Sequence, residues 1–229
     1  MSRFARFLGA IWRHRSGVAL TEFALAAPLL MTAGLWGVET ANQAIVQMRV
    51  NQVAVLIADN AARVGDNSLL GKAQIYESDI NDVLYGAHVQ GGGNFDFYAH
   101  GRVILSSLEV VPATDDQQYI HWQRCMGELH HNSSFGNAGD GLDGSLAGMG
   151  PQGEEIVAFD DEAVMFVEVA YVYQPIISSA FTSAGTMTAT AAFNVRENRD
   201  LSTIHQRDPA KPDPIADCGS FAPLADYYG

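Results

Sequence analysis

A run of 21 residues near the start, Val18–Val38, constrains this chain more than any other feature. It reads VALTEFALAAPLLMTAGLWGV and contains one ionisable side chain, Glu22. As an α-helix, a run of this length extends about 30 Å, the thickness of the hydrocarbon core of a bilayer. Pro28 lies inside the run, and membrane helices tolerate proline better than soluble helices do. We therefore predict a membrane-spanning helix over 18–38.

The charges around this run predict its orientation. Residues 1–17 contain four arginines and no acid, and we interpret them as a basic cytoplasmic leader. The whole chain has 13 basic and 26 acidic residues, so residues 18–229 carry 9 basic against 26 acidic residues and a net charge of −17. This acidity argues against a basic nucleic-acid-binding surface. A cleaved secretory signal would have a shorter apolar region, and a buried core helix rarely follows four arginines.

The helix is expected to continue beyond the membrane, over residues 39–65. From Glu39 to Val64 there is no proline or glycine, and Gly65 offers a C-cap. Apolar residues recur there at spacings of three and four, namely Val46, Val50, Val53, Ile57, Ala61 and Val64. Residues 18–64 therefore predict one helix of about 70 Å, whose amphipathic second half packs on the following domain.

Glu22 is the sharpest feature inside the apolar run. An acid within a span costs on the order of 2–3 kcal/mol at its centre and less near an interface, so a partner is expected. If a peptidase cut after Gly17, Val18 would gain an α-amine with a pKa of about 8. That amine could pair with Glu22 of a neighbouring subunit. The alternative is a tolerated carboxylate near the lipid headgroups.

The N-terminal residues resemble those of a known class of proteins. The basic leader, Gly17, Glu22, Phe23 and the apolar helix resemble the class III signal of type IV pilins and pseudopilins. More narrowly, GVALTEFALAAPLL resembles the opening of TadE-like proteins of the tight-adherence (Tad/Flp) pilus system. Later blocks are similar to that family too: Trp122–Cys125, Gly148–Pro151, Val164–Pro175 and a Thr-x-Thr-Ala strand that ends near Arg196.

The resemblance implies a minor pilin or pseudopilin in the bacterial inner membrane, with a cytoplasmic N-terminus and a periplasmic C-terminal domain. It implies processing by a prepilin peptidase between Gly17 and Val18, and assembly through Glu22 and Phe23. The implied partners are that peptidase, other pilins, the Tad assembly-platform proteins and the lipid bilayer. Val18 replaces the phenylalanine usual at the first mature position of type IV pilins, which leaves methylation of the new amine open.

The rest of the chain predicts a small α+β domain over 66–199. We expect the long N-terminal helix to pack on an antiparallel sheet of this domain, as in pilins. Helical periodicity is weak over 66–90, and residues 126–162 form a Gly-rich loop. Along 163–173, one alternate set of side chains is wholly apolar and should face the core. Strands are predicted at Phe95–His100, Arg102–Val111, Tyr119–Arg124, Ala163–Tyr173 and Thr186–Val195.

The two cysteines, Cys125 and Cys218, both follow the span on the side where oxidation is permitted. They could be two free thiols, but exposed thiols persist poorly there, and we favour a disulfide. That bond would tie the Pro-rich tail, 200–229, to the sheet. The tail itself is expected to follow the surface in extended form.

No residue pattern predicts an enzyme, a metal site or a cofactor. His121, His130 and His131 lie close in sequence, but adjacent histidines are a poor zinc spacing. Asn137–Gly144 lacks the spacing and the final glutamate of a calcium loop. Ser133 and Ser134 have no nucleophile-elbow context.

Three functional hypotheses remain from the sequence. The first is a structural assembly protein that enters a helix bundle. The second is an uncleaved single-span protein whose 126–162 loop binds a ligand or ion. The third, a membrane-tethered hydrolase, ranks below both. N-terminal processing separates the first hypothesis from the second.

Overall fold

The computed structural model describes residues 16–65, 71–91, 95–182, 185–196, 199–224 and 227. The chain divides into two compact units. One comprises the residues up to Ala44 together with Pro175–Ala184, and the other comprises Ile45–Gln174 with Gly185–Gly229. Helix α2, Ser16–Arg63, contributes residues to both. Residues 1–15 of the predicted leader lie outside the described part.

In the first unit, α2 runs unbroken through Pro28. From Gly17 on, this helix is long and apolar enough to cross a membrane. Its threonine hydroxyls donate to carbonyls of the preceding turn, Thr21 to Val18 at 2.8 Å and Thr32 to Pro28 at 2.7 Å. Polar side chains satisfied within their own helix suit a segment that water does not reach.

The second unit is built on a four-stranded sheet with the order β2-β1-β3-β4, in which all neighbours are antiparallel. The strands are β1 (Gly101–Val110), β2 (Gln118–Met126), β3 (Ala163–Val172) and β4 (Thr186–Asn194). Four of the five predicted strands are therefore confirmed, as is the α+β class. The pairing of β1 with β2 shifts register between Ser107 and Leu108.

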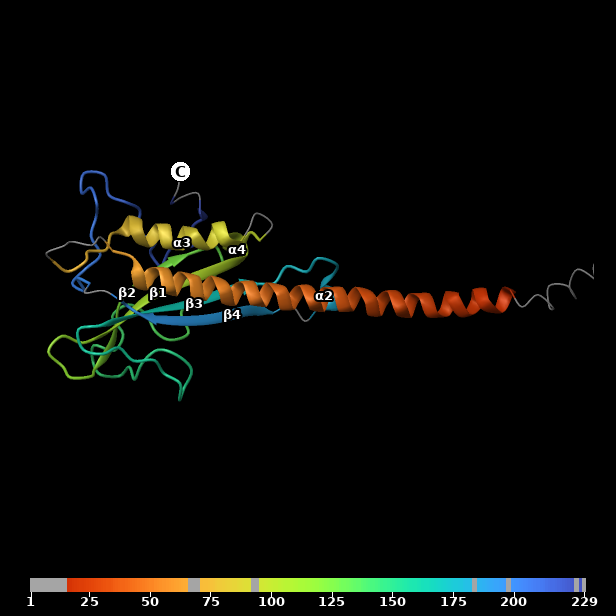
Figure 1. Cartoon of the computed structure of the whole chain (residues 1–229), viewed down its shortest axis with the longest axis horizontal. Helices are drawn as coiled ribbons and strands as arrows, with labels where there is room; N and C mark the ends of the chain where they lie inside the picture. Colours follow the sequence, from red (N-terminus) through yellow and green to blue (C-terminus); the bar gives the residue numbers. More distant parts are fainter. Residues whose placement is uncertain are drawn as a thin grey trace, which may run out of the picture. The chain divides into compact units, whose positions relative to one another are not determined.

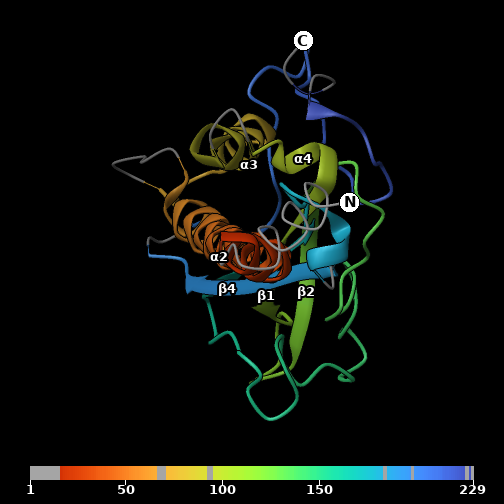
Figure 2. The same ribbon diagram turned by 90° about the vertical axis from the view of Figure 1, so that its right-hand side faces the viewer.

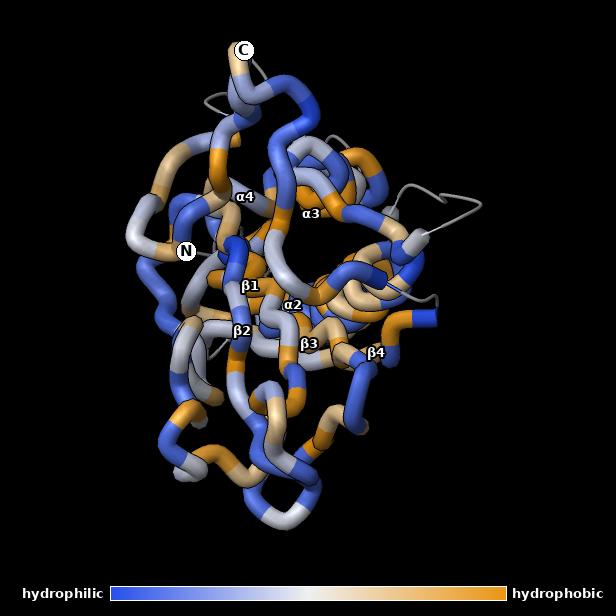
Figure 3. Tube along the Cα trace, turned by 90° about the vertical axis from the view of Figure 1, so that its left-hand side faces the viewer, coloured by the Kyte–Doolittle hydropathy of each residue, from blue (hydrophilic) through white to orange (hydrophobic). Residues whose placement is uncertain are grey.

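The second part of α2 and helix α3, Glu77–Gly91, cover one face of this sheet (Figures 1 and 2). The predicted stripe from Val46 to Ala61 is buried in the core, with Val64 packed at its edge. The predicted inward-facing set of β3 lies in the same core, from Met165 to Tyr173. Figure 3 shows apolar residues gathered where the helices meet the sheet and hydrophilic segments in the outer loops.

The other face of the sheet is also covered, which the alternation along β3 did not predict. Residues 127–162, after the end of β2, form irregular turns that pack there, including the short Met149–Ile156 bridge. A second apolar cluster results, comprising Leu108, Ile120, Met149, Ala158, Val164 and Phe166. The Gly-rich segment is thus a layer of the domain.

The strand predicted at Phe95–His100 is wrong, because Phe97–His100 forms the short helix α4. A strand would point Phe97 and Tyr98 to opposite faces of the sheet. One helical turn instead places both in the same core, where Phe97 stacks on Tyr171 with ring centroids 5.9 Å apart. The Tyr98 hydroxyl donates to the Leu84 carbonyl of α3. Core packing has overridden the local pattern.

Candidate assembly site on the exposed helix

The Gly17–Val18 peptide bond lies in the first turn of α2, which begins at Ser16. A Cβ added to Gly17 would meet no atom within 4 Å. The contacts of the described fold therefore do not require glycine at this position.

Glu22 and Phe23 are both exposed on the helix surface. Within the part of the chain that the structure describes, the Glu22 carboxylate makes no hydrogen bond or ion pair. It lies four residues, about 6 Å along the axis, beyond Val18. A carboxylate in such a position is costly to bury when the surrounding helix leaves water.

Glu39, at the other end of the apolar run, differs from Glu22 in its surroundings. Its side chain is fully buried. Its two carboxylate oxygens accept the backbone N–H groups of Ile176 and Ile177 at 3.3 and 2.9 Å. Sequence analysis missed this role, although Glu39 is the first acid after the run, because the donors lie 137 and 138 residues away. The chain satisfies this acid internally and leaves Glu22 exposed.

The helix between these two acids has no covering within the unit described. All ten large apolar side chains of residues 18–38 are exposed, from Val18 and Leu20 to Trp36 and Val38. Burying a side chain of this size stabilises a protein by about 1.5–3 kcal/mol. In water, the ten exposed side chains therefore leave roughly 15–30 kcal/mol of hydrophobic stabilisation unrealised. That exceeds the net stability of a typical domain. The segment is thus long and apolar enough to cross a membrane.

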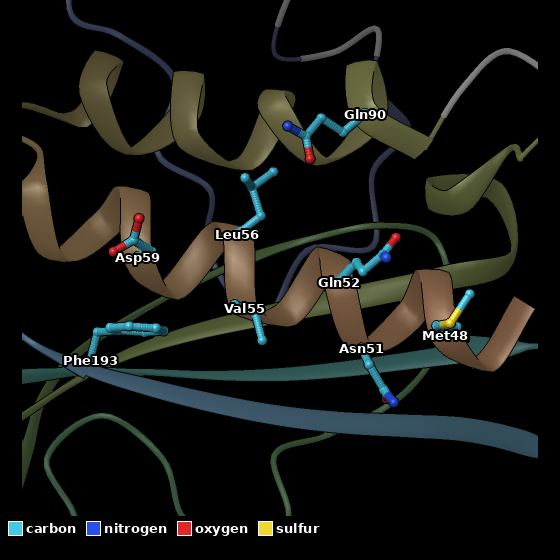
Figure 4. Close-up of a pocket in the computed structure, with 8 residues that line it drawn as sticks. All are labelled: Met48, Asn51, Gln52, Val55, Leu56, Asp59, Gln90 and Phe193. Atoms are coloured by element: carbon cyan, nitrogen blue, oxygen red, sulfur yellow. The ribbon is translucent and has the colours of Figure 1, made fainter.

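The second unit presents a shallow groove of about 610 Å³ along the outward side of α2 (Figure 4). Gln90 of α3 and Phe193 of β4 flank it. Met48 and Val55 project from α2 into this groove and are exposed. The remaining lining residues also come from α2: Asn51, Gln52, Leu56 and Asp59.

The predicted disulfide is present between Cys125 and Cys218, with the two Cα atoms 4.7 Å apart. Arg102 of β1 reinforces this attachment of the tail, and sequence analysis missed it. Its buried guanidinium donates to the Cys218, Ser220 and Gly127 carbonyls at 2.7–3.0 Å. The same group lies 4.1 Å from the centroid of the Phe221 ring.

The three histidines that lie close in sequence, His121, His130 and His131, do not form a metal site. His130 stacks on Phe221, with ring centroids 4.0 Å apart. His121 Nδ1 lies instead 3.0 Å from Glu109 Oε2, across the β1–β2 pair. This hydrogen bond raises the pKa of His121, and burial raises the pKa of Tyr119 beside it to about 12. Among the described residues, no group of three or more His, Cys, Asp or Glu could hold a metal ion.

Carboxylates around the 126–162 segment are used to hold its turns. Asp140 accepts the N–H of Asn137 at 2.8 Å, and Asp143 accepts that of Ser145 at 3.0 Å. Glu168 of β3 accepts bonds from the Ser133 hydroxyl and the Ser134 N–H. Burial raises the pKa of Glu168 in spite of these bonds. The contacts give these acids a structural role and do not favour the ion-binding hypothesis.

Comparisons with protein-family models, curated proteins and solved structures find no match to this chain. The TadE-like resemblance therefore depends on the residues quoted for it above. The function is inferred from the geometry of α2 and its two acids.

Proposed function

We propose that this chain is a minor pilin or pseudopilin-like structural component of Tad (type IVc) pilus biogenesis. A prepilin peptidase would remove residues 1–17, and the chain would assemble through its N-terminal helix. One observation carries the proposal: Glu22 lies exposed, with no partner in the described chain, on an uncovered apolar helix five residues after Gly17.

Cleavage after Gly17 would give Glu22 a chemically suitable partner. The new Val18 amine is mostly protonated at neutral pH, and it adds to the positive end of the helix macrodipole. Two unit charges 4 Å apart attract by about 4 kcal/mol at an effective dielectric constant of 20. An acid within a span costs on the order of 2–3 kcal/mol at its centre and less near an interface. Pairing with a neighbour's amine can therefore offset the cost of burying Glu22 and select one axial register.

The second unit would then act as the periplasmic head that primes, caps or regulates pilus assembly. Its groove along α2, with Met48 and Val55 exposed, is a surface that another assembly protein could cover. The expected partners are other pilins and the platform proteins of the same system.

The test is co-expression of the full chain with a prepilin peptidase and its partner pilins. We expect Glu22→Ala to insert and to be cleaved, but to lose co-purification with those pilins. Leu25→Ala is the matched control, since it shortens another exposed side chain three residues away without removing a charge. Normal co-purification of Glu22→Ala would contradict the pairing role.

A further inference from the structure

We infer that residues 175–182, which connect β3 to β4, rest on the membrane surface as a second lipid contact beside the end of the α2 span. This inference rests on the membrane insertion of α2, which is part of the proposed function. We name these residues the interfacial loop.

The composition of the interfacial loop differs from that of the acidic chain around it. The sequence PIISSAFT contains no ionisable side chain. Ile176 is 61% exposed, and Ile177 is also exposed. Single exposed apolar residues are common on proteins, so exposure alone does not define a binding surface. The position of the loop supplies the further argument.

The interfacial loop is attached to α2 where the apolar run ends. Glu39, which follows the run directly, accepts the N–H groups of Ile176 and Ile177. One turn further along, the Thr182 hydroxyl donates to Gln43 Oε1 at 3.2 Å. Loop and helix end belong to the same compact unit, and Figure 1 shows the chain leaving β3 alongside α2.

The contact between Glu39 and the interfacial loop lies at the depth expected for the membrane–water interface. Trp36 is exposed one turn before Glu39, and tryptophan is enriched at the headgroup level. A span over 18–38 would place Glu39 at the same boundary. Ile176 and Ile177 would then lie where apolar side chains can leave water while the irregular backbone stays out of the hydrocarbon.

The chemistry of the loop also fits lipid. Its two isoleucines would each stabilise the contact on burial, and it carries no acid that anionic headgroups would repel. The Glu39 carboxylate beside it is buried and accepts two backbone N–H groups. Ser178 Oγ accepts the N–H of Ala180 at 3.2 Å, which satisfies a polar group of the exposed turn. We commit to the bilayer as the occupant of this surface.

The experiment places an environment-sensitive fluorophore on single cysteines of the full chain. The chain is reconstituted in phosphatidylcholine–phosphatidylglycerol vesicles that carry nitroxide-labelled lipids. The native cysteines are joined in the disulfide, so the introduced thiol is the one that reacts. The test position is Ile176→Cys. The matched control is Leu142→Cys, which is 57% exposed in the 126–162 segment, and the span reference is Leu25→Cys.

We expect the label at 176 to be quenched by a shallow nitroxide at least twice as strongly as the label at 142. The label at 25 should respond most to a deep nitroxide. Equal quenching at 176 and 142, with strong quenching at 25, would overturn the interfacial loop and leave the span intact. No quenching at 25 would refute membrane insertion itself. A shielded label at 176 that lipid nitroxides do not quench would show that protein covers the loop, which also overturns the proposal.

A second variant tests the attachment. Glu39→Gln keeps the size of the side chain but leaves one strong acceptor where there were two. Quenching at 176 should fall toward the value at 142, while quenching at 25 should not change. An unchanged value at 176 would contradict the role assigned to Glu39.

Discussion

Replacing both cysteines by alanine, C125A/C218A, should lower the free energy of unfolding of the second unit by about 4–5 kcal/mol. The disulfide joins residues 93 positions apart. In the chain-entropy model, a cross-link that closes a loop of about 100 residues reduces the conformational entropy of the unfolded chain, which raises its free energy by about 4.7 kcal/mol at 25 °C.

The native structure should survive this change, because other contacts hold the tail independently. Arg102 donates to the carbonyls of Cys218 and Ser220, and Asn81 donates to that of Pro214 at 2.7 Å. The N–H of Cys125 donates to the Ala216 carbonyl at 2.7 Å. The loss of stability should therefore come mainly from the unfolded state.

The assay is urea unfolding of the full chain in detergent micelles, followed by near-UV circular dichroism. We expect C125A/C218A and the chemically reduced wild type to share one midpoint, well below that of the oxidised wild type. The m-value should rise, because the unlinked unfolded chain exposes more surface. A loss below about 1 kcal/mol, or a changed far-UV spectrum of the folded chain, would refute the reasoning.

Three further predictions concern the second unit. Because the bond to Glu109 raises the pKa of His121, its contribution to stability is present below about pH 6.5 and lost as the pH rises through the folded pKa. The urea midpoint of His121→Gln should thus lie furthest below that of wild type near pH 6. A difference that does not depend on pH would contradict this. The raised pKa of Glu168 makes wild type less stable as the pH rises above about 4.5. The urea midpoint of Glu168→Gln should therefore increase relative to that of wild type over that range. Parallel pH profiles of the two midpoints would refute this prediction. Gly127→Ala should cost about 1–3 kcal/mol more in urea unfolding than Gly153→Ala, since both have positive φ but only at Gly127 would the Cβ lie 2.3 Å from a backbone carbonyl; equal losses would contradict the steric argument.

The regular elements of the fold could be predicted because their periods are long or their composition is distinctive. Helix α2 shows a sustained 3.6-residue stripe, with Gly65 just beyond its end at φ +146°. Strands β1 to β4 are rich in β-branched and aromatic residues, and their observed ends lie close to the predicted ones. The failure at Phe97–His100 involves a segment of four residues, for which period carries little information.

The polar contacts of Glu39, Arg102 and Glu109 could not be predicted, because each joins different elements of the fold. Glu39 and Ile177 are 138 residues apart, and Arg102 and Cys218 are 116 apart. The Glu109–His121 pair depends on the strand register, which shifts at Ser107/Leu108. By contrast, Gly17, Val18, Glu22 and Phe23 follow one another along one helix. Their spacing could be interpreted from sequence alone, whereas their role in assembly remains a prediction.

The N-terminus of the protein extracted from its natural membrane is the most direct test of the account. Intact-mass spectrometry and N-terminal sequencing should find a chain that begins at Val18. Gly17→Ala should retain residues 1–17, whereas Gly34→Ala, another glycine of α2 whose added Cβ meets nothing within 4 Å, should be cleaved normally. A natural chain that still carries its first 17 residues would contradict the pilin-like assembly and leave a membrane-tethered domain.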